Sequence, residues 1–376
     1  MTPRERLSST IRHEEPDRVP CSPWSCILFP SKVLGIKLGD LSGALATYPF
    51  WKAQLRSDKK FGFDSRILSP LCLGGGEYIP VRESEEVKVN KEIIRRKGVK
   101  RWVRITIKTP AGDLTEERCC PEDAVDWGVK PLIDDPERDY KKIRCLLGDP
   151  SSMDFTEHQK AQEIIGDQGL LMLGFDTPWT WWIIRRGEAG FTDPFDYSRT
   201  LGRFCEDYLD FVRKYIGVCD TLQPDLYWIH GVYDGIAGPR LLDRYVFPFI
   251  KEIRKLTSTP LQYFLSGNCM ELLEKVADTG IDILEPLEPF PLGDVDLAEV
   301  KRKIGNRVCL AGNLDPINVV ERGTPQDVER EVRKCIGDAA EGSGYIFATA
   351  DQITNITSVE NVRCMLEAVK KYGRYR

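Results

Sequence analysis

The second half of the chain alternates short apolar runs with longer segments in which apolar positions recur at helical spacing. Each run is short enough for one strand, and each is followed by a segment with helical periodicity. Strands that are apolar throughout are typical of a parallel sheet whose two faces are both covered. The pattern predicts six strand–helix units, with strands within residues 170–175, 225–231, 261–267, 281–289, 307–316 and 344–351.

Two further strands are expected upstream, within residues 17–24 and 63–71. Eight strand–helix units favour a closed (β/α)8 barrel of the TIM type over an open doubly wound sheet. Neither a G-x-G-x-x-G nor a Walker-type glycine loop follows the first strand, which agrees with this choice. We therefore expect a single barrel domain over residues 1–376.

Residues 77–118 break the pattern of the barrel. Polar and β-branched residues alternate there, and the pairs Lys97-Gly98 and Ala111-Gly112 are typical of tight turns. This segment predicts a small antiparallel sheet, inserted between the second and third strands and packed over one end of the barrel.

Composition and charge narrow the class of protein. The 376 residues are 41% hydrophobic, with a net charge of -5 and a pI near 5.6, so a globally basic surface for nucleic acid is excluded. The sequence has no run near the ~18 apolar residues of a membrane span, and its first residues, MTPRERLSST, hold no apolar signal core. We expect a cytoplasmic protein that binds neither nucleic acid nor membrane.

Twelve cysteines and three histidines are scattered along the sequence. It contains no C-x-x-C, so zinc-ribbon, iron–sulfur and thioredoxin-type motifs lack their spacing. Most of the thiols are expected to be small buried hydrophobic groups, kept reduced in a cytoplasm. Cys309 lies inside a strand pattern and fits a core thiol, whereas Cys269, at the start of a helix, leaves a metal ligand open.

Acidic residues follow the sixth expected strand, and reactive groups of such barrels lie at the carboxyl ends of strands. The sequence LEPLEP brings Glu285 and Glu288 there, and GDVDL adds Asp294 and Asp296. Paired carboxylates at this end can bind a metal or share a proton. Acids here can equally be loop residues or helix N-caps, so both interpretations stay open.

The sequence IHGVYDG places His230, Tyr233 and Asp234 at the end of the fourth strand. His230 is the one histidine at an expected strand end, and the alternative is a core histidine bonded to neighbouring backbone. By position alone, the same rule nominates other polar residues at strand ends: Asp176, Ser266, Asn268, Asn313, Asp315 and Asp351.

Aromatic residues gather directly after the third strand, in TPWTWWII. Trp179, Trp181 and Trp182 can form the apolar wall of a ligand site there. The alternative is a helix that packs against the rim of the barrel.

Several segments together carry a resemblance to a known family. In chain order they read EEPDRVP, KTPAGDLTEE, VKPLIDDPERDYKKIRCLL, DILEPLEPFPLGDVDLAEVKRKIG, CLAGNLDP and SVENVRCMLEAVKKYG. On these segments, which run over nearly the whole chain, the sequence resembles the uroporphyrinogen decarboxylase-like superfamily, whose fold is a (β/α)8 barrel. The resemblance implies one of two chemistries: decarboxylation of the acetate arms of uroporphyrinogen, or methyl transfer to or from a corrinoid, as in the methyltransferases and O-demethylases of anaerobes.

The decarboxylase branch differs from this chain after the first strand. Its Arg-Gln-Ala-Gly-Arg-Tyr segment supplies arginines for substrate carboxylates, whereas this chain reads CSPWSCILFPSK, without an arginine. The late Gly-His-Gly of that branch is replaced by ATADQ. The chain therefore resembles the corrinoid-dependent methyltransferase branch more closely.

In that branch zinc is usually bound by a His-x-Cys-Gly at the fifth strand and a Cys at the eighth. The matching positions here hold Phe264, Ser266 and Asp351, and a phenylalanine cannot bind a metal. Zinc would then need a different set of ligands, for which the candidates are Glu285, Asp351, His230 and Cys269.

These residues and the resemblance predict a methyltransferase that moves a methyl group from a small methylated donor, such as an aryl methyl ether, to a corrinoid protein. Glu285 and Asp351 would act as acids or metal ligands, while His230 and Asp234 would position the donor. The corrinoid is expected on a separate protein docked at the barrel mouth, because the chain lacks a D-x-H-x-x-G motif. The expected donor-binding residues are Trp179, Trp182, Tyr233, Asn268, Glu288, Asn313 and Asp176.

Two other functions stay open. A lyase acting on a carboxylate, in the manner of uroporphyrinogen decarboxylase, predicts that an arginine such as Arg185, Arg186 or Arg240 reaches the pocket. A barrel that has lost catalysis and only binds a ligand is the other, because Phe264 replaces a zinc ligand. The resemblance also leaves a homodimer open, since related enzymes are often dimers.

Overall fold

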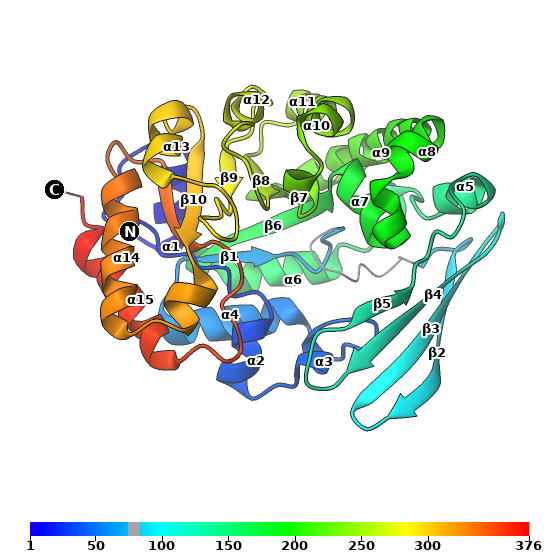
Figure 1. Cartoon of the computed structure of the whole chain (residues 1–376), viewed down its shortest axis with the longest axis horizontal. Coiled ribbons are helices and arrows are strands. Elements are labelled where there is room, and N and C mark those ends of the chain that lie inside the picture. Colours follow the sequence, from blue (N-terminus) through cyan, green and yellow to red (C-terminus); the bar gives the residue numbers. More distant parts are fainter. Residues whose placement is uncertain (74–82, 376) are drawn as a thin grey trace.

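A seven-stranded parallel sheet forms the body of the computed structural model, which describes residues 1–73 and 83–375 (Figure 1). Neighbouring strands follow the order of the chain, and almost every strand residue is buried because helices cover the outside of the sheet. The strands are β1 (Ser65–Leu68), β6 (Gly169–Asp176), β7 (Leu226–Gly231), β8 (Leu261–Leu265), β9 (Ile283–Glu285), β10 (Cys309–Leu314) and β11 (Tyr345–Thr349).

Residues 19–22 lie between the two edges of this sheet. Phe347 on β11 donates its backbone N–H to Pro20 O (3.0 Å) and accepts from Ser22 N (2.9 Å), while Asp64 N, just before β1, donates to Cys21 O (2.9 Å). The segment 17–24, expected as the first strand, is thus an isolated bridge at Cys21. The prolines on either side of Cys21 and Ser22 have no N–H, which prevents a longer ladder.

The buried carboxylate of Asp64 fixes this segment in place. It accepts hydrogen bonds from Cys21 N (2.8 Å), Arg18 Nη1 (2.9 Å) and Arg6 Nη1 (2.5 Å). Arg18 belongs to the sequence EEPDRVP, so the charged residues of that segment attach the N-terminal chain to the start of β1.

Side chains of the strands alternate between two cores. On β7, Tyr227 and Ile229 face the helices, whereas Leu226 and Trp228 face the inside of the curled sheet. The thiol of Cys309 lies in the inner core, as the sequence predicts.

The helices begin where their sequences provide caps. Asp296 caps α13, and Thr324 and Asp327 form a capping box at the start of α14, whose first residue is Pro325. The helices are α1 (Pro3–Ile11), α2 (Leu28–Leu34), α3 (Leu38–Leu41), α4 (Phe50–Phe61), α5 (Pro136–Cys145), α6 (Thr156–Ile165), α7 (Pro178–Arg186), α8 (Asp193–Asp196), α9 (Ser198–Cys219), α10 (Pro239–Tyr245), α11 (Phe247–Leu256), α12 (Leu273–Ala277), α13 (Leu297–Ile304), α14 (Pro325–Ala339) and α15 (Val359–Tyr372). Within the described ranges, none of them is long and apolar enough to cross a membrane.

A separate antiparallel sheet follows β1, at the place where the sequence predicts an insertion, and lies next to α3 and α5 (Figure 1). Its strands are β2 (Lys88–Lys97), β3 (Lys100–Thr109), β4 (Gly112–Pro121) and β5 (Trp127–Lys130). The expected turns are confirmed at Gly98 and Gly112, which have positive φ angles. The expected range 77–118 is corrected to one that extends to residue 130, and residues 77–82 lie outside the described residues.

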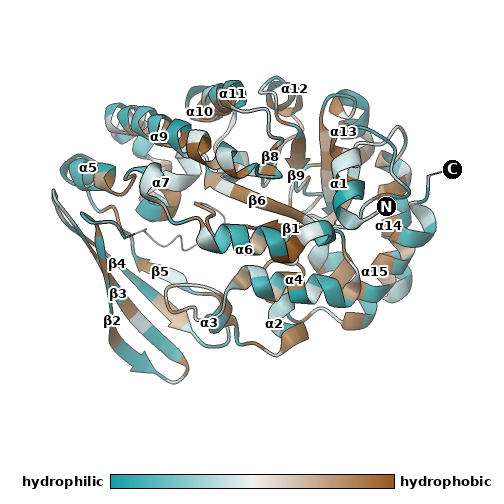
Figure 2. Ribbon diagram, turned by 180° about the vertical axis from the view of Figure 1, so that it is seen from behind, coloured by the Kyte–Doolittle hydropathy of each residue, from teal (hydrophilic) through white to brown (hydrophobic). Residues whose placement is uncertain are grey.

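The outer surface of this sheet is basic. Residues 88–109 hold nine lysines and arginines but one acid, Glu92, in a chain whose net charge is -5. Most of these side chains are exposed, and β2, the edge strand, is largely hydrophilic (Figure 2). Charged residues on an edge strand discourage pairing with further strands. The basic residues are Lys88, Lys91, Arg95, Arg96, Lys97, Lys100, Arg101, Arg104 and Lys108.

Candidate functional site

A cavity of about 210 Å³ opens at the carboxyl ends of β7, β8 and β11. This is the end of the sheet at which barrels of this kind place their reactive groups. Its walls come from the chain after the Cys21 bridge, from α7, and from the ends of the three strands. The lining residues are Trp24, Cys26, Ile184, Trp228, His230, Val232, Tyr233, Phe264, Asp351 and Gln352.

His230 is the imidazole of this cavity, and Asp176 orients it. Nδ1 of His230 lies 2.8 Å from Oδ1 of Asp176, whose carboxylate is fully buried at the end of β6. Because an ionised carboxylate can only accept, Nδ1 carries the proton of the neutral ring. Nε2 is then the ring nitrogen available to a ligand in the cavity. Asp176, expected as a donor-binding residue, therefore lies behind the histidine.

Asp351 lies directly after β11, on the cavity wall. Its Oδ1 accepts the backbone N–H of Gln352 (2.6 Å), and its side chain is exposed to solvent. Desolvation by the surrounding protein raises the pKa of Asp351, and the hydrogen bond from the backbone N–H of Gln352 partly offsets this effect. Gln352 in turn accepts from Ile27 N (3.1 Å), so the wall is tied to the chain that carries Trp24.

Three aromatic rings form the apolar floor of the cavity. Trp24 and Trp228 lie 5.5 Å apart between ring centroids, and each lies 5.6 Å from Phe264. The ring of His230 stacks on Trp228 at 4.8 Å. Sequence reasoning missed Trp24 and Trp228 as site residues. The signal for Trp228 was its position two residues before His230 on one strand, which puts both side chains on the same face.

Of the described residues that line the cavity, none is a lysine or an arginine. Arg66 on β1 lies inside the curled sheet and is paired with Glu285, at 2.5 Å between Nη2 and Oε1. Both side chains of this pair are almost fully buried, and Gln262 donates to the other carboxylate oxygen of Glu285. Glu285, which the sequence predicted as an acid or metal ligand, is therefore one partner of an internal ion pair. It does not line the cavity.

Asp234 is also buried, beneath the site. It accepts hydrogen bonds from Tyr263 OH (2.7 Å), Thr177 Oγ1 (3.1 Å) and Thr180 Oγ1 (3.2 Å). Burial raises the pKa of Asp234 to about 6, against the effect of these hydroxyl donors. Because its two oxygens are occupied and it does not line the cavity, Asp234 holds β6, β7 and β8 together rather than facing a donor.

The chain after β8 and β9 places the next group of expected residues at the rim. Glu288 accepts the backbone N–H of Gly267 (2.6 Å), and burial raises the pKa of Glu288 to about 7. Asn268 is exposed in the same turn, outside the cavity. Cys269 is buried, its N–H donates to Asp294 Oδ1 (2.8 Å), and burial raises the pKa of its thiol to about 12.

Asn313 on β10 lies away from the cavity. Its Oδ1 accepts from Cys335 Sγ (3.5 Å) on α14, so the side chain faces the helix layer. Asn313 lies at a strand end, as expected, but its side chain does not point towards a ligand site at the mouth. Asp315 caps the chain that follows, through the N–H groups of Ile317 and Asn318.

The side chains of Trp179 and Trp182 pack α7 against its neighbours and do not line the cavity. Trp182 is fully buried, donates from Nε1 to Asp193 (2.6 Å) and packs on Phe204 at 5.1 Å between centroids. Trp179 is 1% exposed and stacks on Tyr245 at 6.5 Å. The sequence left this arrangement open as its alternative. Tyr233 alone among the expected aromatic residues lines the cavity.

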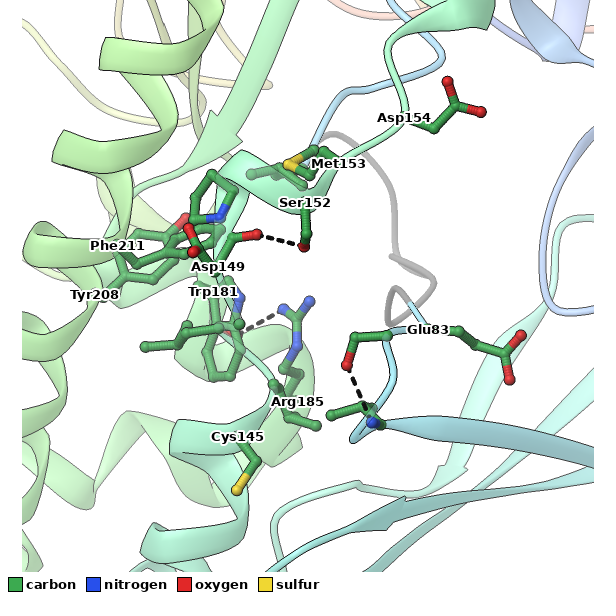
Figure 3. Close-up of a pocket in the computed structure, with 17 residues that line it drawn as sticks. Glu83, Cys145, Asp149, Ser152, Met153, Asp154, Trp181, Arg185, Tyr208 and Phe211 are labelled. Carbon is green, nitrogen blue, oxygen red and sulfur yellow. Dashed lines mark hydrogen bonds between the residues drawn. The ribbon is translucent and has the colours of Figure 1, made fainter.

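A second cavity, of about 380 Å³, lies between α7, α9 and the chain after α5 (Figure 3). Arg185 stacks on Trp181 there, at 3.9 Å from the guanidinium carbon to the ring centroid. Arg186 is paired with Asp193 (3.1 Å), and Arg240 is exposed. None of the three arginines that a lyase could use lines the first cavity, although Arg185 Nη1 lies 4.0 Å from Oδ2 of Asp176, the carboxylate behind His230.

The residues at the mouth do not fit a zinc ion. Phe264 has no donor atom, and its ring packs against Trp24 and Trp228. Throughout residues 1–73 and 83–375, no three histidine, cysteine, aspartate or glutamate side chains come together as metal ligands. The candidate set of Glu285, Asp351, His230 and Cys269 is therefore not assembled, because Glu285 is paired internally and Cys269 is buried in its turn.

Known proteins are similar to this chain in sequence and in fold. A uroporphyrinogen decarboxylase (URO-D) family model matches residues 191–372. The uroporphyrinogen decarboxylase of Mannheimia succiniciproducens is 33% identical over 115 residues, which are 31% of this chain and 30% of that enzyme. The chain thus matches about a third of the length of such a relative.

Two longer similarities cover more of the chain. The uroporphyrinogen decarboxylase of Vesicomyosocius okutanii is 31% identical over 256 residues, 63% of this chain and 70% of that enzyme. A methyltransferase from Methanosarcina mazei has the same fold, with a TM-score of 0.65 and 13% identity over 99% of both chains. From its sequence, the chain belongs to the uroporphyrinogen decarboxylase family.

Proposed function

We propose that this protein is a methyltransferase, which takes a methyl group from a small methylated compound bound at the barrel mouth and passes it to a corrinoid on a separate protein. One observation carries the proposal. An imidazole oriented by a buried carboxylate opens onto a small aromatic cavity whose described lining holds no cationic side chain.

The residues of the cavity have different roles in the proposed reaction. The aromatic floor excludes water from the methyl group, and a second proton bound at Nε2 of His230 can be donated to an oxygen that leaves as the methyl group departs. Asp176 holds the ring in one orientation, and Asp351 faces the same ligand. The corrinoid, when bound, supplies the nucleophile that accepts the methyl group.

The similarity to the methyltransferase of Methanosarcina mazei supports this proposal at the level of the fold. Decarboxylation of a carboxylate substrate is the second candidate, because the named sequence relatives are decarboxylases. A polycarboxylate needs several cations at close range, however, and a cavity of about 210 Å³ is small beside the ~300–1,000 Å³ of typical ligand sites.

Methyl transfer to free reduced cobalamin, followed by its absorption spectrum, tests the proposal with a panel of methylated donors. We expect transfer by the wild type from at least one donor. His230→Gln and Asp351→Asn should each lower the rate about 100-fold, the scale of a lost general acid or base. Asp243→Asn removes an exposed acid paired with Lys275 and should leave the rate unchanged.

Two results would overturn the proposal. One is full activity in both cavity variants. The other is release of carbon dioxide from uroporphyrinogen by the wild type, with no methyl transfer from any donor.

A further inference from the structure

We propose that the ligand of the mouth cavity is a small organic cation with a methylated ammonium group. This inference rests on the proposed function, since it names the class of methyl donor. It is carried by two properties of the cavity: the carboxylate on its wall and its aromatic lining.

The charge at the mouth is negative. Among the described residues that line the cavity, Asp351 is the one acid. The buried Arg66 is paired with Glu285 at 2.5 Å. Arg185 stacks on Trp181 in the second cavity, and its Nη1 lies 4.0 Å from Oδ2 of Asp176, so its charge is balanced by the carboxylate behind His230. A cationic ligand therefore meets a carboxylate at the wall and no competing lysine or arginine among the described lining residues.

The floor suits the apolar surface of a methylated cation. Trp24 and Phe264 line the cavity, and the faces of aromatic rings carry negative electrostatic potential. Methyl groups on a quaternary nitrogen share its charge and are apolar, so they gain from both ring contact and burial. The carboxylates of a macrocyclic substrate would gain neither from contact with the ring faces nor from burial in an apolar cavity.

The chemistry of transfer balances without a proton. When the methyl group moves to the reduced corrinoid, the carbon–nitrogen bond breaks and its electron pair stays on nitrogen. The cationic donor thus leaves as a neutral amine, whereas the oxygen of an ether must take up a proton to leave. Asp351 and the rings serve to select and hold the cation before transfer.

The experiment compares choline with 3,3-dimethylbutan-1-ol, in which a neutral carbon replaces the charged nitrogen. Binding of each to the full chain is measured by calorimetry at constant ionic strength. We expect choline to bind at least about tenfold more tightly. Asp351→Asn should reduce this ratio towards one, and Asp243→Asn should preserve it. Phe264→Leu gives a second test, because loss of one ring should also lower the ratio.

The outcomes separate the inference from the proposed function. Equal or tighter binding of the neutral compound, or no binding of choline, overturns the inference. If anisole then serves as a methyl donor, the proposed function survives without it. If choline binds through Asp351 but no donor transfers a methyl group to cobalamin, the cation site stands and the proposed function fails.

Discussion

Asp234 and Asp351 are both aspartates at strand ends, yet their surroundings give them different chemistry. Asp234 is fully buried and accepts three side-chain hydroxyl groups, while Asp351 is exposed on the cavity wall. The sequence predicted a catalytic role for both. Burial decides which of them a ligand can reach, and burial is a property of the packed strands rather than of the motif.

The buried carboxyl of Asp234 should make stability depend on pH. Its pKa is about 6 in the folded chain and ~3.9 in an unfolded one. Between these values only the folded chain holds the proton, so the group stabilises the fold at low pH and the contribution is lost as pH rises through 6. The Asp234→Asn variant has no ionisable group at this position, so its unfolding free energy should lack this dependence on pH. Denaturant unfolding from pH 4 to 7 should show the wild type losing up to about 3 kcal/mol relative to the variant.

A difference that stays constant over that pH range would show that Asp234 keeps its ordinary pKa. Asp243→Asn, at an exposed position, is the control and should show no such slope.

At the scale of elements, the Arg66–Glu285 pair joins β1 to β9 across the inside of the curled sheet. Glu285→Gln leaves the guanidinium buried without a counter-charge, which should cost about 3 kcal/mol of unfolding free energy. Breaking the exposed pair of Lys275 and Asp243 should cost less than about 1 kcal/mol. Urea unfolding of Glu285→Gln and Asp243→Asn measures both. Similar losses in the two variants would contradict a buried ion pair.

The strands could be predicted from the sequence because apolar runs followed by helical patterns report burial directly. Seven of the expected strands formed, and the first became a bridge at Cys21, where prolines interrupt the ladder. The partners of side chains could not be predicted in the same way. Glu285 meets an arginine 219 residues earlier in the chain, and no local pattern indicates that pairing.

The candidate site was predicted only in part, because the sequence shows where strands end but not which way side chains point. Position at strand ends found His230, Tyr233 and Asp351, which line one cavity. It could not say that Asn313 turns towards α14 or that Trp182 packs inside α7, since direction depends on tertiary packing. Trp24 could not be found by this rule, because it follows an isolated bridge and not the end of a regular strand.

At the scale of the whole molecule, charge is divided between two bodies of the fold. The strands over residues 88–109 carry nine basic residues and one acid, whereas the complete chain is acidic, with a net charge of -5. The antiparallel sheet is thus a positive lobe on a negative barrel. Such a molecule has a large electric dipole moment, which net charge and pI do not report.

This dipole has a chromatographic consequence. A protein with a pI near 5.6 should flow through a cation exchanger at pH 7.5, but the positive lobe can face the resin and hold the molecule. We expect retention at low ionic strength and release as salt screens the contact. Replacing Arg95, Arg96 and Lys97 by glutamate should abolish it. If the wild type flows through the column at low salt, the positive sheet does not bind the resin independently of the negative remainder of the chain. If it is retained, the protein should turn the same sheet towards any negatively charged surface.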